Sequence, residues 1–196
     1  MCSSDLALAL DPDSVDAQAM LALTLVGRVL EQMSDSTAAD IERAERLVGT
    51  ALAASPRHAL AHFACAQVLR AQGRHNDAIP EYEIALALDH NSVAAIAALG
   101  LTRLLAGSIE GVIPAQEQAI RLSPRDPRVP NWCWRIGMVH LLQGRPAEAI
   151  NWLEQSYRQK EGVDISLIRV HPFLDPLRRD PRFEKLANQI VPLDVK

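Results

Sequence analysis

The sequence repeats at an interval of 34 residues, and this period constrains the fold more than any other feature. Gly73 and Gly107 are separated by it, and so are Ala66 and Gly100. Apolar residues recur at three- and four-residue spacing before and after each glycine, which predicts two helices joined by a tight turn. Such a unit buries its apolar face only by stacking on its neighbours. We therefore predict an all-α fold, a right-handed α-solenoid of antiparallel helix pairs closed by a C-terminal capping helix.

The period divides the chain into six segments. The sequence LALALDPD near the start matches ALALDHN at residues 85–91, so the chain opens on the end of a second helix. About ten extra residues near Met33–Thr37 interrupt the first full copy. The predicted segments are a partial repeat at 1–14, a repeat with an insertion at 15–58, repeats at 59–92, 93–126 and 127–163, and a C-terminal capping segment at 164–196.

Small residues recur where the two helices of each pair are expected to cross closely. They are Ala22, Ala44 and Ala51, then Ala66, Ala78 and Ala85, then Gly100 and Ala119, then Gly137, Ala149 and Ser156. Pro56 and Pro124 follow second helices, where proline blocks continuation. The small residues, the prolines and the period resemble the tetratricopeptide repeat family over roughly Asp5–Gly162. This resemblance implies a scaffold that binds another protein or a peptide.

The last part of the chain carries a narrower resemblance. HPFLDPLRRDPRFEKL at residues 171–186 is similar to the closing segment of tetratricopeptide arrays attached to bacterial class III adenylate/guanylate cyclases and to some winged-helix regulators. The likeness implies an alternative function, a regulatory C-terminal tail of a larger signalling enzyme or transcription regulator. Locally, we expect a helix to begin within Asp164–Val170, and Asp180 to cap a final helix that starts at Pro181.

The partial repeat at residues 1–14 lacks its partner helix, so an apolar face is expected to be open there. That face indicates either a longer protein or a second chain that covers it. The second alternative function is therefore a self-assembling structural module, with a homodimer formed through the N-terminal half-repeat.

Composition narrows the classes of partner and compartment. The net charge is -4, which gives no reason to expect nucleic acid or an anionic membrane as the partner. The three cysteines are far apart and form no CxxC pair, which favours a reducing compartment. The apolar stretches are shorter than the roughly 18–20 residues that span a bilayer, and no basic segment precedes the first one. These features predict a cytoplasmic protein.

Residues with catalytic or metal-binding chemistry do not form a recognisable constellation. The sequence has no phosphate-binding loop, nucleophile elbow or HExxH motif, so we predict no enzyme activity, no cofactor and no metal site. His58 and His62 are interpreted as a solvated pair, and His140 as a packing histidine with its hydrogen bonds satisfied. Cys65 and Cys133 fall within first helices, where a buried free thiol behaves as a small hydrophobe.

The first helices of the repeats are expected to line a concave, unusually apolar groove. The residues predicted to face it are Leu23, Val26, Phe63, Gln67, Arg70, Leu101, Leu104, Trp134, Met138 and Leu141. Phe63, Trp134 and Met138 are the expected anchors, because aromatic groups dominate interface energetics and methionine adapts to varied partners. The natural ligand would be an amphipathic helix or an extended apolar peptide. One alternative stays open, that the C-terminal segment around Phe173 folds back into this groove.

Overall fold

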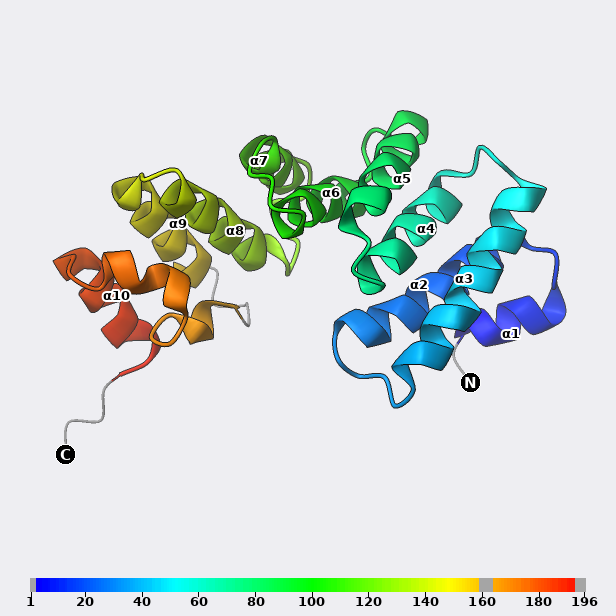
Figure 1. Ribbon diagram of the computed structural model, residues 1–196, viewed down its shortest axis with the longest axis horizontal. Helices are drawn as coiled ribbons and strands as arrows, with labels where there is room; N and C mark the ends of the chain where they lie inside the picture. Colours follow the sequence, from blue (N-terminus) through cyan, green and yellow to red (C-terminus); the bar gives the residue numbers. More distant parts are fainter. Residues whose placement is uncertain (1–2, 159–163, 193–196) are drawn as a thin grey trace. The chain divides into compact units, whose positions relative to one another are not determined.

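The computed structural model describes residues 3–158 and 164–192, and all regular structure within these ranges is helical (Figure 1). The chain divides into two compact units, Met1–Ser108 and Ile109–Lys196. The predicted all-α class of stacked helix pairs is confirmed. Each unit is described below by itself.

The first unit is built from helix pairs joined by short turns. It contains α1 (Ser3–Leu10), α2 (Val15–Leu30), α3 (Thr37–Ala54), α4 (Ala59–Ala71), α5 (His75–Leu88) and α6 (Val93–Leu105). Helix α2 packs along α3, and α4 packs along α5, while α2 also contacts α4 (Figure 1). One core cluster joins α2, α3 and α4, and a second joins α4, α5 and α6.

Local chemistry sets the ends of these helices. The Ser14 hydroxyl accepts a hydrogen bond from the Ala17 amide at 3.3 Å and so caps α2. Helix α4 ends at a turn in which Gly73 has φ of +73°, a left-handed conformation that side chains with a Cβ rarely adopt. Gly107 and Gly144 take the same conformation after α6 and after the first helix of the last pair, as the sequence predicted.

The extra residues of the first full repeat are spread over three places. Helices α2 and α3 have 16 and 18 residues, whereas α4 and α5 have 13 and 14. The connection at residues 31–36 is also longer than the turn after α4. The insertion expected near Met33–Thr37 therefore lengthens both helices as well as their turn.

The second unit ends in the capping segment. It contains α7 (Val112–Leu122), α8 (Val129–Leu142), α9 (Pro146–Arg158), the 3₁₀ helices η1 (Asp164–Leu167) and η2 (Pro172–Leu177), and α10 (Pro181–Ile190). The helix expected within Asp164–Val170 is only this short 3₁₀ turn. The predicted cap at Asp180 is confirmed, because its carboxylate accepts from the Arg182 amide at 2.9 Å.

The boundary between the units falls inside the predicted repeat 93–126. It lies in the connection between α6 and α7, where Gly107 and Gly111 both have positive φ. The pairing of these two helices as one repeat stays a prediction. None of the helices in the described parts of the chain combines the length and apolar character needed to cross a membrane.

The small residues mark the closest helix crossings. Ala22, Ala44 and Ala51 are completely buried in the first unit. In the second unit, a Cβ added to Gly137 would lie 3.2 Å from the Ala149 carbonyl oxygen and 3.4 Å from Leu153 Cγ. The backbones of α8 and α9 therefore approach too closely for a branched side chain at residue 137.

This crossing predicts opposite effects for two glycine substitutions. Gly137→Val should lower the free energy of unfolding by roughly 1–3 kcal/mol, because its side chain meets backbone. Gly49→Ala should raise it by about 0.5–1 kcal/mol, because exposed Gly49 lies within α3 and a Cβ there meets nothing within 4 Å. Urea unfolding followed by circular dichroism measures both. A Gly137→Val protein as stable as the parent would contradict the close crossing.

Candidate functional site

The first and second helices of the pairs differ in how much apolar surface they carry. Helices α4 and α6 contain one charged residue each, Arg70 and Arg103, whereas α3 contains five. A helix that is apolar all round is normally buried on all sides. In the first unit, α4 and α6 bury residues on more than one face, and other apolar side chains stay partly exposed.

Phe63, Gln67 and Arg70 share one face of α4, because they follow at i, i+4 and i+7. All three are half-buried. The Phe63 ring lies 6.0 Å from the Tyr82 ring, which anchors it against α5. Gln67 Oε1 accepts from Arg70 Nε at 3.1 Å and from Arg70 Nη2 at 2.8 Å. This face therefore presents an aromatic edge beside a pre-ordered polar pair.

The remaining predicted groove residues of the first unit fall into two groups. Leu23, Leu101 and Leu104 are half-buried, so part of each side chain is open to solvent. Val26 is only 1 % exposed and belongs to the core between α2, α3 and α4. Val26 is thus a core residue, which corrects its expected place on an open surface.

The predicted anchors of the second unit are covered by the chain's own C-terminal segment. Trp134 and Met138 are 6 % and 7 % exposed, and they share a core cluster with Leu174 and Leu177 of η2. The His171 ring packs edge-on to Trp134, with 5.7 Å between the centroids. The expectation that Trp134 and Met138 are open to a partner is therefore wrong, and the fold-back alternative describes this unit.

Burial of two leucines explains why the segment docks there. Leu174 and Leu177 are completely buried, and burying a leucine stabilises a fold by roughly 1.5–3 kcal/mol. Phe173, which was expected to fold back, is instead 58 % exposed. It lines a small, mostly apolar pocket together with Met138, half-buried Leu141, Leu142, Pro172 and Pro176. The spacing of the two leucines in PFLDPL is the sequence signal of this docking.

His58, which precedes α4, and His62, which lies within it, are not a solvated pair. His62 is 9 % exposed; its Nδ1 lies 2.7 Å from Glu81 Oε2, and its Nε2 lies 3.0 Å from the Pro56 carbonyl oxygen. His58 caps α4 by accepting from the Ala61 amide at 3.3 Å, and its Nε2 lies 3.2 Å from Asp16. Both rings are structural links between helices. Over residues 3–158 and 164–192, histidine, cysteine and acidic side chains form no group of three or more that is placed to hold a metal ion.

His140 is buried in α8 as predicted, but its hydrogen bonding is incomplete. It is 8 % exposed, and its Nδ1 has no hydrogen-bond partner in the described part of the chain. Burial lowers its pKa, and the positive charge of Arg145 lowers it further, against smaller opposing effects of Glu148 and Glu117. This environment therefore favours the neutral form of the imidazole.

The two described cysteines are shielded thiols. Burial raises the pKa of Cys65 to about 12, with a further contribution from the carboxylate of Glu81. Burial also raises the pKa of Cys133 to about 11. Because the thiolate is the nucleophile, neither group is activated for covalent chemistry at neutral pH. Cys2 lies outside the described residues.

Comparisons with known proteins agree with this architecture. A family model of the tetratricopeptide repeat matches residues 36–93 and 66–127. The solved structure of PilF from Pseudomonas aeruginosa is similar with a TM-score of 0.70 and 22% identity, covering 90% of this chain and 76% of that one. The structure of YrrB is similar with a TM-score of 0.68 and 16% identity, covering 97% of this chain and 93% of that one. The structure of MamA is similar with a TM-score of 0.61 and 19% identity, covering 81% of this chain and 85% of that one. No curated protein matches the sequence.

The environment of His140 predicts a loss of stability in acid. Its pKa is lowered in the folded state, so the unfolded chain binds more protons once the pH falls below the ordinary histidine pKa of about 6.5. The free energy of unfolding should therefore drop between about pH 7.5 and pH 5, and it should drop less in His140→Leu. Urea titrations of both proteins at the two pH values measure the difference. An identical drop in the variant would refute the assignment.

The thiol environments predict slow chemical labelling. In a Cys2→Ser background at about pH 8, Ellman's reagent should react with buried Cys133 only on the timescale of unfolding, and with half-buried Cys65 far more slowly than with a free thiol, because little thiolate forms in the native state. Both thiols should react at once in denaturant. Fast reaction of either thiol in native buffer would contradict its placement.

Proposed function

The chain belongs to the tetratricopeptide repeat family, and we propose that this protein-interaction scaffold binds a peptide segment of a partner along the first helices of the Met1–Ser108 unit. The observation that carries the proposal is the surplus apolar surface of α2, α4 and α6. Their side chains Leu23, Phe63 and Leu101 are half-buried, so part of each apolar surface stays open to solvent beside the core. Exposed apolar surface of this kind marks sites of protein contact.

The chemistry of this face favours a largely apolar ligand with a polar group. Leu101 and Leu104 offer apolar contact, while Gln67 and Arg70 offer hydrogen-bond donors and acceptors already held in place by each other. An amphipathic helix or an extended apolar segment provides matching side chains at regular spacing. YrrB, which has a similar fold, is described as a protein with an unusual peptide-binding site, and this supports a peptide as the ligand class.

A hollow beside Phe63 provides a place for one ligand side chain. It has a volume of about 270 Å³ and is lined by residues that include Asp16, His58, Leu60, Phe63 and Asp89. Its lining combines apolar with polar side chains, a combination typical of sites that hold a ligand in one orientation. In the second unit the equivalent anchors are covered, so the proposal is restricted to the first.

The test uses peptides selected on the intact wild-type chain. Random peptides of about twelve residues are displayed on phage, enriched on the immobilised protein, and synthesised with a fluorescent label. Leu101→Glu should raise the dissociation constants of the selected peptides about tenfold or more, because a charge is placed in an apolar contact. Gln67→Ala, which leaves the core intact, should weaken binding by a smaller factor. Fluorescence anisotropy measures both.

The matched control is Ile84→Glu, the same change at a 41 % exposed residue of the second helix α5. It should leave peptide binding unchanged, and circular dichroism should report equal helicity in all variants. Selection that enriches no peptide, or peptides that bind Leu101→Glu and Gln67→Ala as tightly as the parent, would overturn the proposal.

A further inference from the structure

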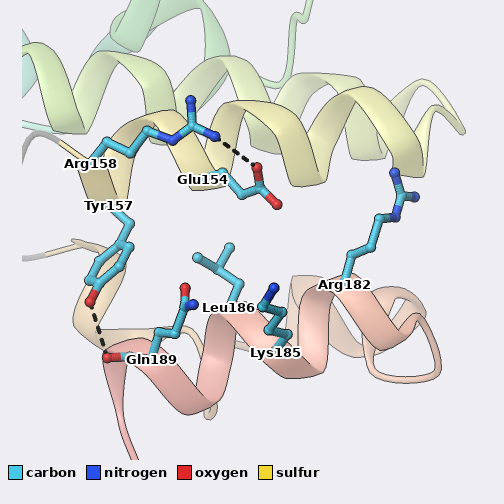
Figure 2. Close-up of a pocket in the computed structure, with 7 residues that line it drawn as sticks. All are labelled: Glu154, Tyr157, Arg158, Arg182, Lys185, Leu186 and Gln189. Atoms are coloured by element: carbon cyan, nitrogen blue, oxygen red, sulfur yellow. Dashed lines mark hydrogen bonds and ion pairs between the residues drawn. The ribbon is translucent and has the colours of Figure 1, made fainter.

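A cleft separates α9 from α10 in the second unit (Figure 2). It is lined by Glu154, Tyr157 and Arg158 of α9 and by Arg182, Lys185, Leu186 and Gln189 of α10. Its volume is about 380 Å³, within the range of roughly 300–1,000 Å³ for small-ligand sites. No first helix contributes to this lining, so the cleft is separate from the surface of α2, α4 and α6 that is proposed above to bind a peptide.

The cations of this cleft are set in place by the helix that carries them. Arg182, Lys185 and Gln189 follow at i, i+3 and i+7, so they share one flank of α10. The other flank is fixed in the core by Phe183 and Ala187, each 1 % exposed. The positive groups are therefore attached to a rigid element.

The cleft carries more positive than negative charge. Among its lining residues, three cations face one carboxylate, Glu154. Arg158 donates to Glu154 at 3.4 Å, and Arg182 donates from Nε and Nη2 to Asp180 at 3.2 and 2.8 Å. Lys185 has no carboxylate within ion-pair distance in the part of the chain that the structure describes. Because a guanidinium has five N–H groups, both arginines keep donors for a ligand.

The base of the cleft is apolar and well fixed. Leu186 is 3 % exposed and forms part of the core. Tyr157 is half-buried, and its hydroxyl donates to the Gln189 carbonyl oxygen at 3.2 Å, which ties α9 to α10 (Figure 2). An apolar side chain of a ligand can rest on these two residues while its charged neighbours reach the cations above.

We propose that this cleft binds an acidic segment of a partner polypeptide. One ligand carboxylate pairs with Lys185, and others pair with the free N–H groups of Arg158 and Arg182. Figure 2 shows Glu154 between the two arginines, which places their ligand carboxylates on either side of it. The chain's net charge of -4 opposes long-range attraction of every anionic partner, acidic peptides included. The choice of a peptide therefore rests on the apolar contact that Leu186 and Tyr157 offer beside the cations.

The test measures anisotropy of a fluorescein-labelled peptide made of three Glu-Leu-Gly-Glu units on the full chain. The double variant Arg158→Glu/Lys185→Glu should raise its dissociation constant about tenfold or more, since close charge pairs become repulsive. Lys185→Gln, a milder change, should raise it by a smaller factor. The peptide with glutamine in place of glutamate should bind the wild type about tenfold more weakly or worse.

The matched control is Arg121→Glu/Arg125→Glu, which makes the same change in net charge at two exposed residues of the same unit. It should leave the dissociation constant within about twofold of the wild type. Equal loss in both double variants, equal binding of the glutamine peptide, or no saturable binding to the wild type would overturn the proposal. Competition by a short single-stranded oligonucleotide as strong as that by the acidic peptide would also overturn it, by assigning the cleft to nucleic acid. These variants leave α4 and α6 unchanged. The result for the cleft is therefore separate from the result of the peptide selection that tests the surface of α2, α4 and α6.

Discussion

The close approach of paired helices is the constraint on which the rest of this structure depends. Between α8 and α9, the backbone at Gly137 lies so near the Ala149 carbonyl that a Cβ would approach it to 3.2 Å. In the first unit, fully buried alanines such as Ala22 and Ala51 occupy the crossing of α2 with α3. Small residues at the crossing leave no room for large side chains there. The large apolar residues of the first helices are therefore placed on the neighbouring faces, where they must find other contacts.

That displacement explains why the two helices of a pair have different surfaces. Helix α3 buries a single stripe of Ala44, Val48 and Ala51, and its other faces are charged and solvated. Helix α6 buries residues over most of its circumference and still has Leu101 and Leu104 partly open. The excess apolar surface of the first helices is thus a consequence of how the helices pack. The chain covers this surplus on α8, and the peptide-binding surface proposed above is the part on α2, α4 and α6 that stays partly open.

Local and periodic features were predictable from the sequence, whereas the packing of one segment over another that is distant in the sequence was not. The glycine turns, the Asp180 cap and the buried small residues follow from backbone chemistry and a fixed period, and the structure agrees with each. Phe63 and Trp134 occupy similar places in their first helices, yet only Trp134 is closed, because Leu174 and Leu177 from a distant segment pack over it. The link between His62 and Glu81 likewise joins residues 19 positions apart on different helices. The cleft between α9 and α10 was missed for the same reason, since its two sides come from segments that no period relates.

The covered face of the second unit indicates what an open first-helix face accepts. Helix α8 receives a short segment that inserts two leucines three residues apart and keeps its prolines and Phe173 outside. The segment is compact rather than strand-like, and it needs no backbone pairing with the helix that it covers. The partner proposed for the first unit would meet similar half-buried leucines on α6, with Gln67 and Arg70 of α4 as additional polar contacts. The docked C-terminal segment is therefore the best physical template for such a partner, and it favours a short helical turn with two apolar side chains over a long extended strand.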